Sequence, residues 1–485
     1  MIFFRILGFL SLINIVNSFV SLKPSFIKPT KLIQKIEKKQ IEKQKIRDIQ
    51  EKIADPPNKF PISGFYGLIG PKIDYKNVSS LFDLFTGDGI IQGIFLENGT
   101  ATFTQSLVNT EKRQFENNGY SYKKHIFITV LHMILNYLRI IPNMLGVANT
   151  AFLKVSNIDT TKTYALFERD MPYEIRIDSL EKKINTIGKH TVPGLHTFSG
   201  HSKVINGNIE TIEYNILNNQ VIWYQLDSDF KKLNKIYIQM KYMPMVHDFY
   251  SDEKYILLID SPIKIDLPNI LFEKIPLRFD KSEPTFIYLI EKTSGKIETF
   301  KTDRSLYIFH YSDVKIKENT INILSPFYDN IDYNKVLHHG KYRRLRIDRT
   351  TGSVQLFKYR ELEPLNLDFP IILWKGSVKQ YILRNIEDGR INGFYILEKT
   401  DIVKKIIFEE YFICGEPGVF YLERETNNNN TNRNNNNTRQ PVLVCFGIHE
   451  LTKMQYFIMV NLETDEQIKY PISYPLFIGF HSIIL

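Results

Sequence analysis

The stretch Tyr255-Ile256-Leu257-Leu258-Ile259 is a short run of aromatic and aliphatic residues, which is the composition typical of a buried β-strand. Similar runs occupy residues 235–240 and 455–460. Asn-Gly and Asp-Gly pairs such as Asn206-Gly207 and Asp388-Gly389 separate these runs and favour tight turns between strands. So many short strands in one large unit predict an all-β protein, and a β-propeller rather than a sandwich. The sequence contains no WD or kelch signature that would count the blades.

The N-terminus has the features of a targeting segment. Residues 1–18 contain an early Arg5, an apolar run, and Val16 and Ser18 at the spacing that a signal peptidase accepts. The run is shorter than a bilayer requires, so a cleaved signal peptide is predicted, with an uncleaved anchor as the alternative. The residues that follow are basic and hydroxylated. They resemble the two-part plastid leaders of algae with complex plastids, so entry into the secretory pathway or a plastid is expected.

Residues 19–57 are predicted to be a basic arm, flexible or helical. Isoleucines spaced three or four apart favour an amphipathic helix that reaches Ile53. Between Lys23 and Lys52 this arm carries +6 of the formal charge of +9. Since the remainder is close to neutral, no nucleic-acid partner is expected. Residues 58–485 then form one domain, within which Cys414 and Cys445 allow at most one disulfide.

Two segments interrupt the strand pattern. Residues 125–145 are apolar at helical spacing, with one stripe formed by Leu131, Ile134, Leu135 and Leu138. This segment is either a buried helix or one that dips into a membrane surface. Residues 427–437 are rich in asparagine and predict a disordered insert between two strands.

Four histidines lie in short apolar or aromatic runs that are typical of strand ends: His201, His247, His310 and His481. The last stands four residues before the end of a stretch whose aliphatic composition predicts a terminus docked in the core. We hypothesise that the four imidazoles converge on one metal. Their intervals of 46, 63 and 171 residues match no local metal motif, so the spacing alone does not establish this.

Carboxylates in otherwise apolar surroundings support that hypothesis. Glu168, Asp368 and Glu416 are of this kind, and a ligating imidazole needs an acceptor for its second ring N–H. A buried carboxylate without such a role is costly. Imidazole ligands without thiolates suit iron, zinc, copper or nickel and do not choose between them.

Five segments resemble the carotenoid cleavage oxygenase family, in order along the folded part. Residues 63–71 are similar to the family's early strand that ends in Gly-Pro, and residues 84–90 to its Phe-Asp-Gly-Asp-Gly-Met turn. The others are residues 103–111, 146–151 and 165–173, the last of which carries Glu168. The resemblance implies a seven-bladed β-propeller with an α-helical cap.

The resemblance also implies roles for the residues of the site. It implies that the four histidines bind Fe(II), and that three carboxylates are their outer partners: Glu168, Asp368 and Glu416. Because all four histidines are kept, an active site is expected rather than a vestigial one.

Several positions depart from the family pattern. Ser202 stands in place of Pro, Ser106 in place of Arg, and Ser482 in place of Gly, while Asp313 stands where Asn is common. Asp368 replaces a Glu and is one methylene shorter, so it reaches its imidazole only if the strand shifts or a water bridges the two. Metal affinity or activity is expected to fall if neither occurs.

The implied activity is oxidative cleavage of a carbon–carbon double bond in a carotenoid or apocarotenoid, with O₂ as co-substrate and two carbonyl products. The expected partners are a lipophilic polyene and a peripheral membrane surface facing residues 125–145, with no required protein partner. Two alternatives stay open. The same iron site serves isomerases and enzymes that cleave stilbene-like aromatics, and a propeller without activity would bind an apocarotenoid or a protein partner.

Overall fold

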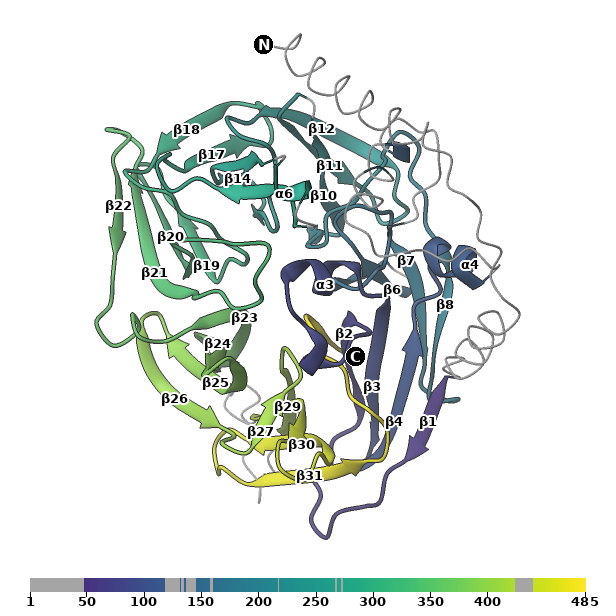
Figure 1. Ribbon diagram of the computed structural model, residues 1–485. Coiled ribbons are helices and arrows are strands. Elements are labelled where there is room, and N and C mark those ends of the chain that lie inside the picture. Colours follow the sequence, from purple (N-terminus) through teal and green to yellow (C-terminus); the bar gives the residue numbers. More distant parts are fainter. Residues whose placement is uncertain are drawn as a thin grey trace, which may run out of the picture. The chain divides into compact units, whose positions relative to one another are not determined.

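The computed structural model describes residues 48–117, 131, 135–136, 145–157, 160–216, 218–266, 268–271, 274–423 and 439–485. Residues 48–485 belong to one compact unit, in which seven β-sheets surround a central axis (Figure 1). The fold is therefore the predicted seven-bladed β-propeller. The signal segment 1–18, most of the arm 19–57 and the insert 427–437 lie outside the described residues.

Each blade is an antiparallel sheet of four or five strands. Blade 1 contains β1 (Ile49–Lys52), β2 (Gly64–Pro71), β3 (Gly89–Glu97), β4 (Thr100–Leu107) and β32 (Ser482–Ile484). Blade 2 contains β5 (Ala151–Ser156), β6 (Thr161–Leu166), β7 (Tyr173–Asp178) and β8 (Lys183–Lys189). Blade 3 contains β9 (Lys203–Ile205), β10 (Asn208–Asn215), β11 (Gln220–Leu226) and β12 (Lys232–Gln239). Blade 4 contains β13 (Tyr250–Ser251), β14 (Tyr255–Asp260), β17 (Phe286–Glu291) and β18 (Ile297–Lys301).

The remaining blades follow the same plan. Blade 5 contains β19 (Asp313–Ile316), β20 (Thr320–Phe327), β21 (Lys341–Asp348) and β22 (Val354–Phe357). Blade 6 contains β23 (Leu367–Lys375), β24 (Val378–Glu387), β25 (Arg390–Glu398) and β26 (Asp401–Ile407). Blade 7 contains β27 (Tyr411–Ile413), β28 (Gly418–Glu423), β29 (Arg439–His449), β30 (Gln455–Asn461) and β31 (Gln467–Ile472).

Within the described residues, few elements lie outside the blades. They are the hairpin of β15 (Ile263–Ile265) and β16 (Leu277–Phe279), the 3₁₀ turn Tyr75–Asn77, and the short helices α3 (Leu81–Thr86), α4 (Glu111–Asn117) and α6 (Pro268–Leu271). The predicted α-helical cap is not confirmed, because most of residues 125–145 lies outside the described part. Of that segment's apolar stripe, Leu131 and Leu135 are described; both are helical and half-buried. Ile134 and Leu138 are not described, and none of the helices that the structure describes could cross a bilayer.

The two ends of the propeller sequence meet in blade 1. β32 pairs antiparallel with β2, with Ser482 opposite Leu68 and Ile484 opposite Tyr66. Figure 1 places the C-terminus near the axis and the strands β12, β18, β22, β26 and β31 at the rim. The strand at the other end of each sheet therefore faces the axis. The predicted docking of the C-terminal stretch is confirmed.

The arm before the propeller is partly a strand. The sequence predicts a helix up to Ile53, but Ile49–Lys52 is β1, which pairs with β4 at the edge of blade 1. The prediction is wrong here because a spacing of four residues puts Ile49 and Ile53 on one side of a helix and equally on one side of a strand. The folded unit thus begins at Asp48 and not at residue 58.

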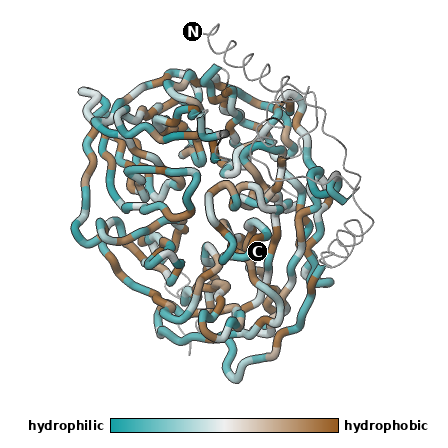
Figure 2. Tube along the Cα trace, in the orientation of Figure 1, coloured by the Kyte–Doolittle hydropathy of each residue, from teal (hydrophilic) through white to brown (hydrophobic). Residues whose placement is uncertain are grey.

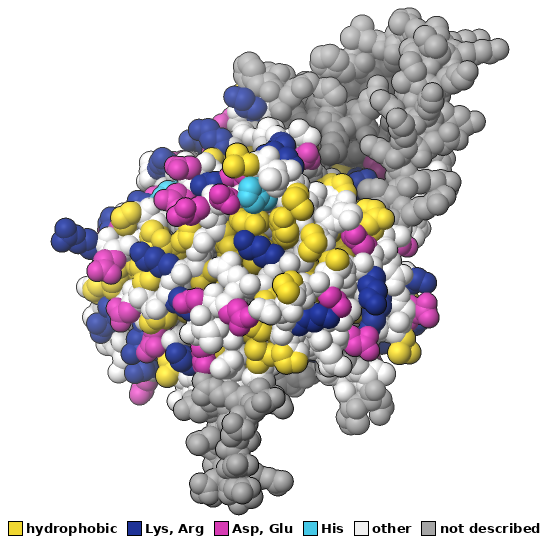
Figure 3. All heavy atoms as spheres, turned by 90° about the horizontal axis from the view of Figure 1, so that it is seen from below, with side chains coloured by type: hydrophobic (Ala, Val, Ile, Leu, Met, Phe, Trp, Pro, Cys, Tyr) yellow, Lys and Arg dark blue, Asp and Glu magenta, His cyan; other side chains and the backbone are white. Residues whose placement is uncertain are grey.

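Apolar side chains from neighbouring sheets fill the space between blades. Figure 2 shows hydrophobic and hydrophilic residues interspersed along the chain. Cys414 and Cys445 are buried in this core as free thiols. On the face that Figure 3 shows, basic and acidic side chains are intermixed, without a large area of one sign.

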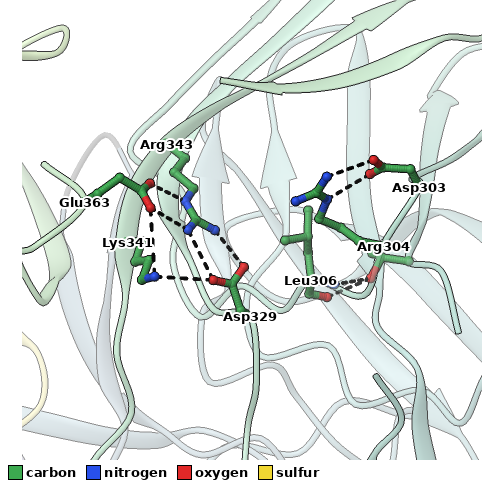
Figure 4. Close-up of polar contacts among 8 residues, drawn as sticks. Asp303, Arg304, Leu306, Asp329, Lys341, Arg343 and Glu363 are labelled. Carbon is green, nitrogen blue, oxygen red and sulfur yellow. Dashed lines mark hydrogen bonds and ion pairs between the residues drawn. The ribbon is translucent and has the colours of Figure 1, made fainter. Parts of the chain in front are cut away.

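A buried arginine in blade 5 ties two loops together (Figure 4). Arg343 is 1% exposed, and its guanidinium donates to Glu363 at 2.6 and 2.8 Å and to Asp329 at 2.7 Å. Asp329 follows β20, whereas Glu363 lies in the segment that leads to Asp368 on β23. The guanidinium therefore links blade 5 to the start of blade 6.

Arg343→Met is expected to lower the free energy of unfolding by roughly 3 kcal/mol, because two carboxylates lose a shared cation. Arg304→Met is the matched control. Figure 4 shows that Arg304 also makes a two-point pair, with Asp303, but these side chains are 45% and 68% exposed. Its loss should cost less than about 1 kcal/mol. Urea denaturation measures both values, and equal losses would contradict the role given to Arg343.

Candidate metal centre

The four histidines of the sequence prediction lie together at the axis. Each comes just before the axial strand of its blade: His201 before β9, His247 before β13, His310 before β19 and His481 before β32. The ring centroid of His201 lies 4.5 Å from that of His247, 5.1 Å from that of His310 and 4.7 Å from that of His481. Residues far apart in the sequence are thus brought together because successive blades present the same strand end to the axis.

The ring nitrogens of three of these histidines, His201, His247 and His310, face one another. Nε2 of His201 lies 3.0 Å from Nε2 of His247, and one nitrogen each of His201, His247 and His310 lies within 4.8 Å of the others. Nε2 of His310 is buried and has no hydrogen-bond partner among the described residues. Buried nitrogens that face a common point without a donor are what a metal ion satisfies.

A carboxylate lies against the opposite ring nitrogen of three of the four histidines. Nδ1 of His247 contacts Oε1 of Glu168. Nδ1 of His310 lies 2.9 Å from Oδ1 of Asp368, and Nδ1 of His481 lies 3.2 Å from Oε1 of Glu416. A carboxylate on Nδ1 holds the proton there and leaves the lone pair of Nε2 for a metal.

The seven side chains come from seven different blades. The histidines belong to blades 1, 3, 4 and 5, and the carboxylates of Glu168, Asp368 and Glu416 belong to blades 2, 6 and 7. The sequence-predicted residues are therefore all brought together, and each blade contributes one of them.

Burial and neighbouring charges set the protonation of the cluster. Burial, and then the other imidazoles, lower the pKa of His201 well below its usual value. Burial also lowers the pKa of His310, although Asp368 opposes this effect. Burial acts to lower the pKa of His247 too, but the carboxylates of Glu168, Asp248 and Asp368 together outweigh it and the pKa is raised. His201 and His310 are thus neutral near pH 7, the state in which imidazole binds a metal.

The shorter side chain of Asp368 reaches its imidazole directly. Its second oxygen, Oδ2, accepts a hydrogen bond from the hydroxyl of Tyr328 at 2.5 Å. The pairing of β23 with β24 shifts register between Asp368 and Ile371, and Phe369 has a φ of 56°. This bulge re-aims the strand at Asp368, so no bridging water is needed.

The other residues that depart from the family pattern also make polar contacts in the structure. Ser482 donates to Glu416 Oε2 from its backbone N–H at 2.7 Å and from its hydroxyl at 3.1 Å, which fixes the carboxylate beside His481. The hydroxyl of Ser202 donates to the carbonyl of Ser199 at 3.0 Å. Ser106 donates to Asp48 at 2.8 Å, and Asp313 lies 3.4 Å from the ammonium of Lys379.

Close packing holds the segment that carries His481. A Cβ atom on Gly479 would lie 2.3 Å from Cγ of Leu68, and one on Gly70 would lie 2.4 Å from the carbonyl oxygen of Ile478. The residues before His481 thus lie against β2 with no room for a side chain. This contact fixes the position of His481 along the propeller axis.

The centre borders an apolar cluster. Buried members include Tyr307 and Tyr328, and Phe309 and Phe480 pack against the cluster. The ring of Phe309 lies 5.1 Å from that of His247. A lipophilic molecule at the centre would therefore meet aromatic and aliphatic side chains.

Sequence reasoning missed three residues near the histidines: Tyr328, Phe369 and Arg384. Tyr328 holds Asp368, while Phe369 contacts the rings of His310 and His481 at 4.5 and 4.9 Å. Their positions depend on the register of β23 and on an unusual backbone conformation, for which no local sequence pattern exists. The donor set itself, imidazoles without thiolates, fits iron among other late first-row metals.

Comparisons with known proteins agree with this geometry. A model of the retinal pigment epithelial membrane protein family matches residues 57–430. The chain is 23% identical over 448 residues to a probable carotenoid cleavage dioxygenase 4, chloroplastic, of Arabidopsis thaliana, covering 83% of this chain and 72% of the relative. It is also 23% identical over 374 residues to carotenoid 9,10(9',10')-cleavage dioxygenase 1 of the same plant, covering 71% of this chain and 66% of the relative.

Solved structures share the fold at low identity. Cobalt-substituted Synechocystis apocarotenoid oxygenase superposes with a TM-score of 0.68 at 15% identity, covering 91% of this chain and 96% of that one. A lignostilbene dioxygenase of Pseudomonas brassicacearum superposes with a TM-score of 0.67 at 16% identity, covering 90% and 94%.

Proposed function

Because the chain belongs to the retinal pigment epithelial membrane protein family of carotenoid cleavage oxygenases, we propose that it is an Fe(II)-dependent dioxygenase that cleaves a carbon–carbon double bond of a carotenoid or apocarotenoid. The observation that carries the proposal is the set of four imidazoles at the axis, three of which have a carboxylate on Nδ1. Relatives named as carotenoid cleavage dioxygenases support the substrate class.

His201, His247, His310 and His481 would hold the ferrous ion through Nε2. When bound, a ferrous ion supplies the one-electron chemistry that lets O₂ react with a carbon–carbon double bond. Both atoms of O₂ enter the products, one on each former alkene carbon, so no proton has to be delivered or removed. The carboxylates keep the Nδ1 protons of their imidazoles in place throughout.

The apolar cluster supports a polyene as the substrate. Tyr307, Phe309 and Phe480 border the histidines and would exclude water from the reacting bond. The hydroxyl of Tyr328 in this region donates to Asp368. The protein's contribution is thus to hold the ion and to orient an apolar chain beside it.

Location in a plastid is part of the proposal. The N-terminal segment predicts a leader, and the first relative is named as chloroplastic. Association with a membrane surface remains a prediction from residues 125–145.

The test is a single-turnover reaction of the full-length chain. The protein is loaded with Fe(II) without oxygen, then exposed to isotopically labelled O₂ with carotenoids, apocarotenoids and stilbenes. Quenching with a reductant converts carbonyl products to alcohols before their oxygen exchanges with water. We expect one labelled oxygen in each of two fragments, and none from protein loaded with Zn(II).

Other results would assign the protein a different activity or substrate class. Bound iron with an isomerised and unlabelled product would identify an isomerase. Cleavage of stilbenes but not of carotenoids would identify stilbene-like aromatics as the substrate class. Bound iron without any product from any probe would contradict a dioxygenase and favour a ligand-binding propeller.

A further inference from the structure

Phe369 has an unusual backbone and an unusual set of contacts. Its φ of 56° lies in the left-handed region, which bulky residues rarely adopt. Its ring lies 4.5 Å from that of His310 and 4.9 Å from that of His481, which belong to blades 5 and 1. One aromatic side chain of blade 6 thus touches two of the four imidazoles. A strained backbone of this kind persists only where its surroundings hold it.

Arg384 lies against that ring. Its guanidinium carbon is 3.7 Å from the ring centroid of Phe369, and on β24 it stands opposite Asp368 in the sheet register. The side chain is 9% exposed, and its Nε is buried without a hydrogen-bond partner among the described residues. No ion pair within the described residues reaches it.

Burial of a cation without a direct carboxylate partner is costly, and burial lowers the pKa of Arg384. Two features offset that cost. The face of an aromatic ring attracts a guanidinium, and the negative charges of Asp368 and Glu416 lie near enough to oppose the effect of burial on the pKa. Both carboxylates are partners of the imidazoles that Phe369 touches.

We propose that Phe369 and Arg384 are a positioning pair for the metal centre, an inference that rests on the proposed function. Arg384 holds the ring of Phe369 in its strained place. The ring in turn fixes the planes of His310 and His481, so that both Nε2 lone pairs point at the ion. Neither residue touches the ion or the reacting bond.

The chain offers a matched control pair in blade 5. The guanidinium carbon of Arg344 lies 4.6 Å from the ring centroid of Phe357, and the two residues are opposite each other on β21 and β22. Nε of Arg344 is likewise buried without a partner among the described residues. Phe357 makes no ring contact with a histidine within the part that the structure describes. The control pair therefore shares the stacking and the enclosed Nε without the neighbouring imidazoles, although both of its residues are half-buried rather than buried.

The experiment titrates Co(II) into the full-length apoprotein and records the visible absorption bands of the ion, which report its ligand geometry. Arg384→Met and Phe369→Leu should each raise the dissociation constant roughly 10- to 100-fold and alter the bands. Phe369→Tyr keeps the ring and should restore both to nearly the wild-type values. Arg344→Met and Phe357→Leu should leave affinity and spectrum unchanged.

The outcomes separate this inference from the proposed function. If Phe369→Leu binds Co(II) with wild-type affinity and spectrum, the positioning pair is refuted while the metal centre stands. If the wild-type chain gives no histidine-type Co(II) spectrum, both are refuted. Phe369→Leu removes no charge, so it decides the question even if Arg384→Met does not fold, which circular dichroism reveals.

Discussion

Replacing His247 with alanine is expected to abolish detectable cleavage and to weaken metal binding by more than about 100-fold, beyond the loss typical of an outer partner. Two physical reasons combine. The centre loses one donor nitrogen, and Glu168 loses the imidazole that its carboxylate contacts. A partly buried carboxylate without its partner is costly, so it would compete with the remaining imidazoles for the ion or take up a proton. Metal content after dialysis and single-turnover cleavage measure the two effects.

His449→Ala is the matched control. Nε2 of His449 lies 3.2 Å from a carboxylate oxygen of Glu410, so it too is a histidine with an acidic partner. It stands at the end of β29 in blade 7 and is not among the residues whose nitrogens converge at the axis. Its variant should keep full metal content and cleavage. A His247→Ala protein that retains iron with unchanged affinity would show that His247 is not a ligand.

Replacing Asp368 with glutamate is expected to lower metal affinity by roughly 100-fold, although the family carries glutamate there. Both oxygens of Asp368 are engaged, at 2.9 Å from His310 and 2.5 Å from Tyr328, and the residue is 4% exposed. An added methylene has no free space, so it displaces the carboxylate from both partners. Overpacking should also lower the free energy of unfolding by about 1–3 kcal/mol.

Comparison with Asp368→Asn separates size from charge. Asparagine keeps the volume and loses the charge, so it should weaken Co(II) binding without the overpacking cost in urea denaturation. If Asp368→Glu instead binds Co(II) more tightly than the wild type, the bulge at Phe369 does not compensate for the shorter side chain, and the site is merely weakened by its aspartate.

No single motif in the sequence identifies the propeller; only the number and composition of its short strand-like runs indicate this fold. Runs such as residues 255–259 predict strands, and their number favours a propeller over a sandwich, but no motif counts seven blades. The strand β1 was not predictable because Ile49 and Ile53 fit a helix as well as a strand. Its state is decided by the open edge of β4, with which it pairs over four residues.

The site was more accessible to prediction than the fold around it. Each of the four histidines stands at a strand end in apolar surroundings, and buried carboxylates need partners. Both kinds of residue can therefore be identified as site candidates from their local sequence alone. Which carboxylate serves which histidine depends on the order of blades around the ring. The contact of Phe369 with two imidazoles depends on one positive φ, which a Phe in a strand gives no reason to expect.

One side chain from each blade meets at the axis, so a bound ion would couple the unfolding of several blades. In proteins built from repeats each unit contacts only its neighbours, so stability is close to a sum of local terms. An ion held by blades 1, 3, 4 and 5 would join blade 1 to blades that are not its neighbours. At a free metal concentration 100 times the dissociation constant, binding adds about 2.7 kcal/mol, and opening of any ligand-bearing blade forfeits it. The loaded ring should therefore melt in one concerted transition, whereas the metal-free ring should lose its blades over a broader range of temperature.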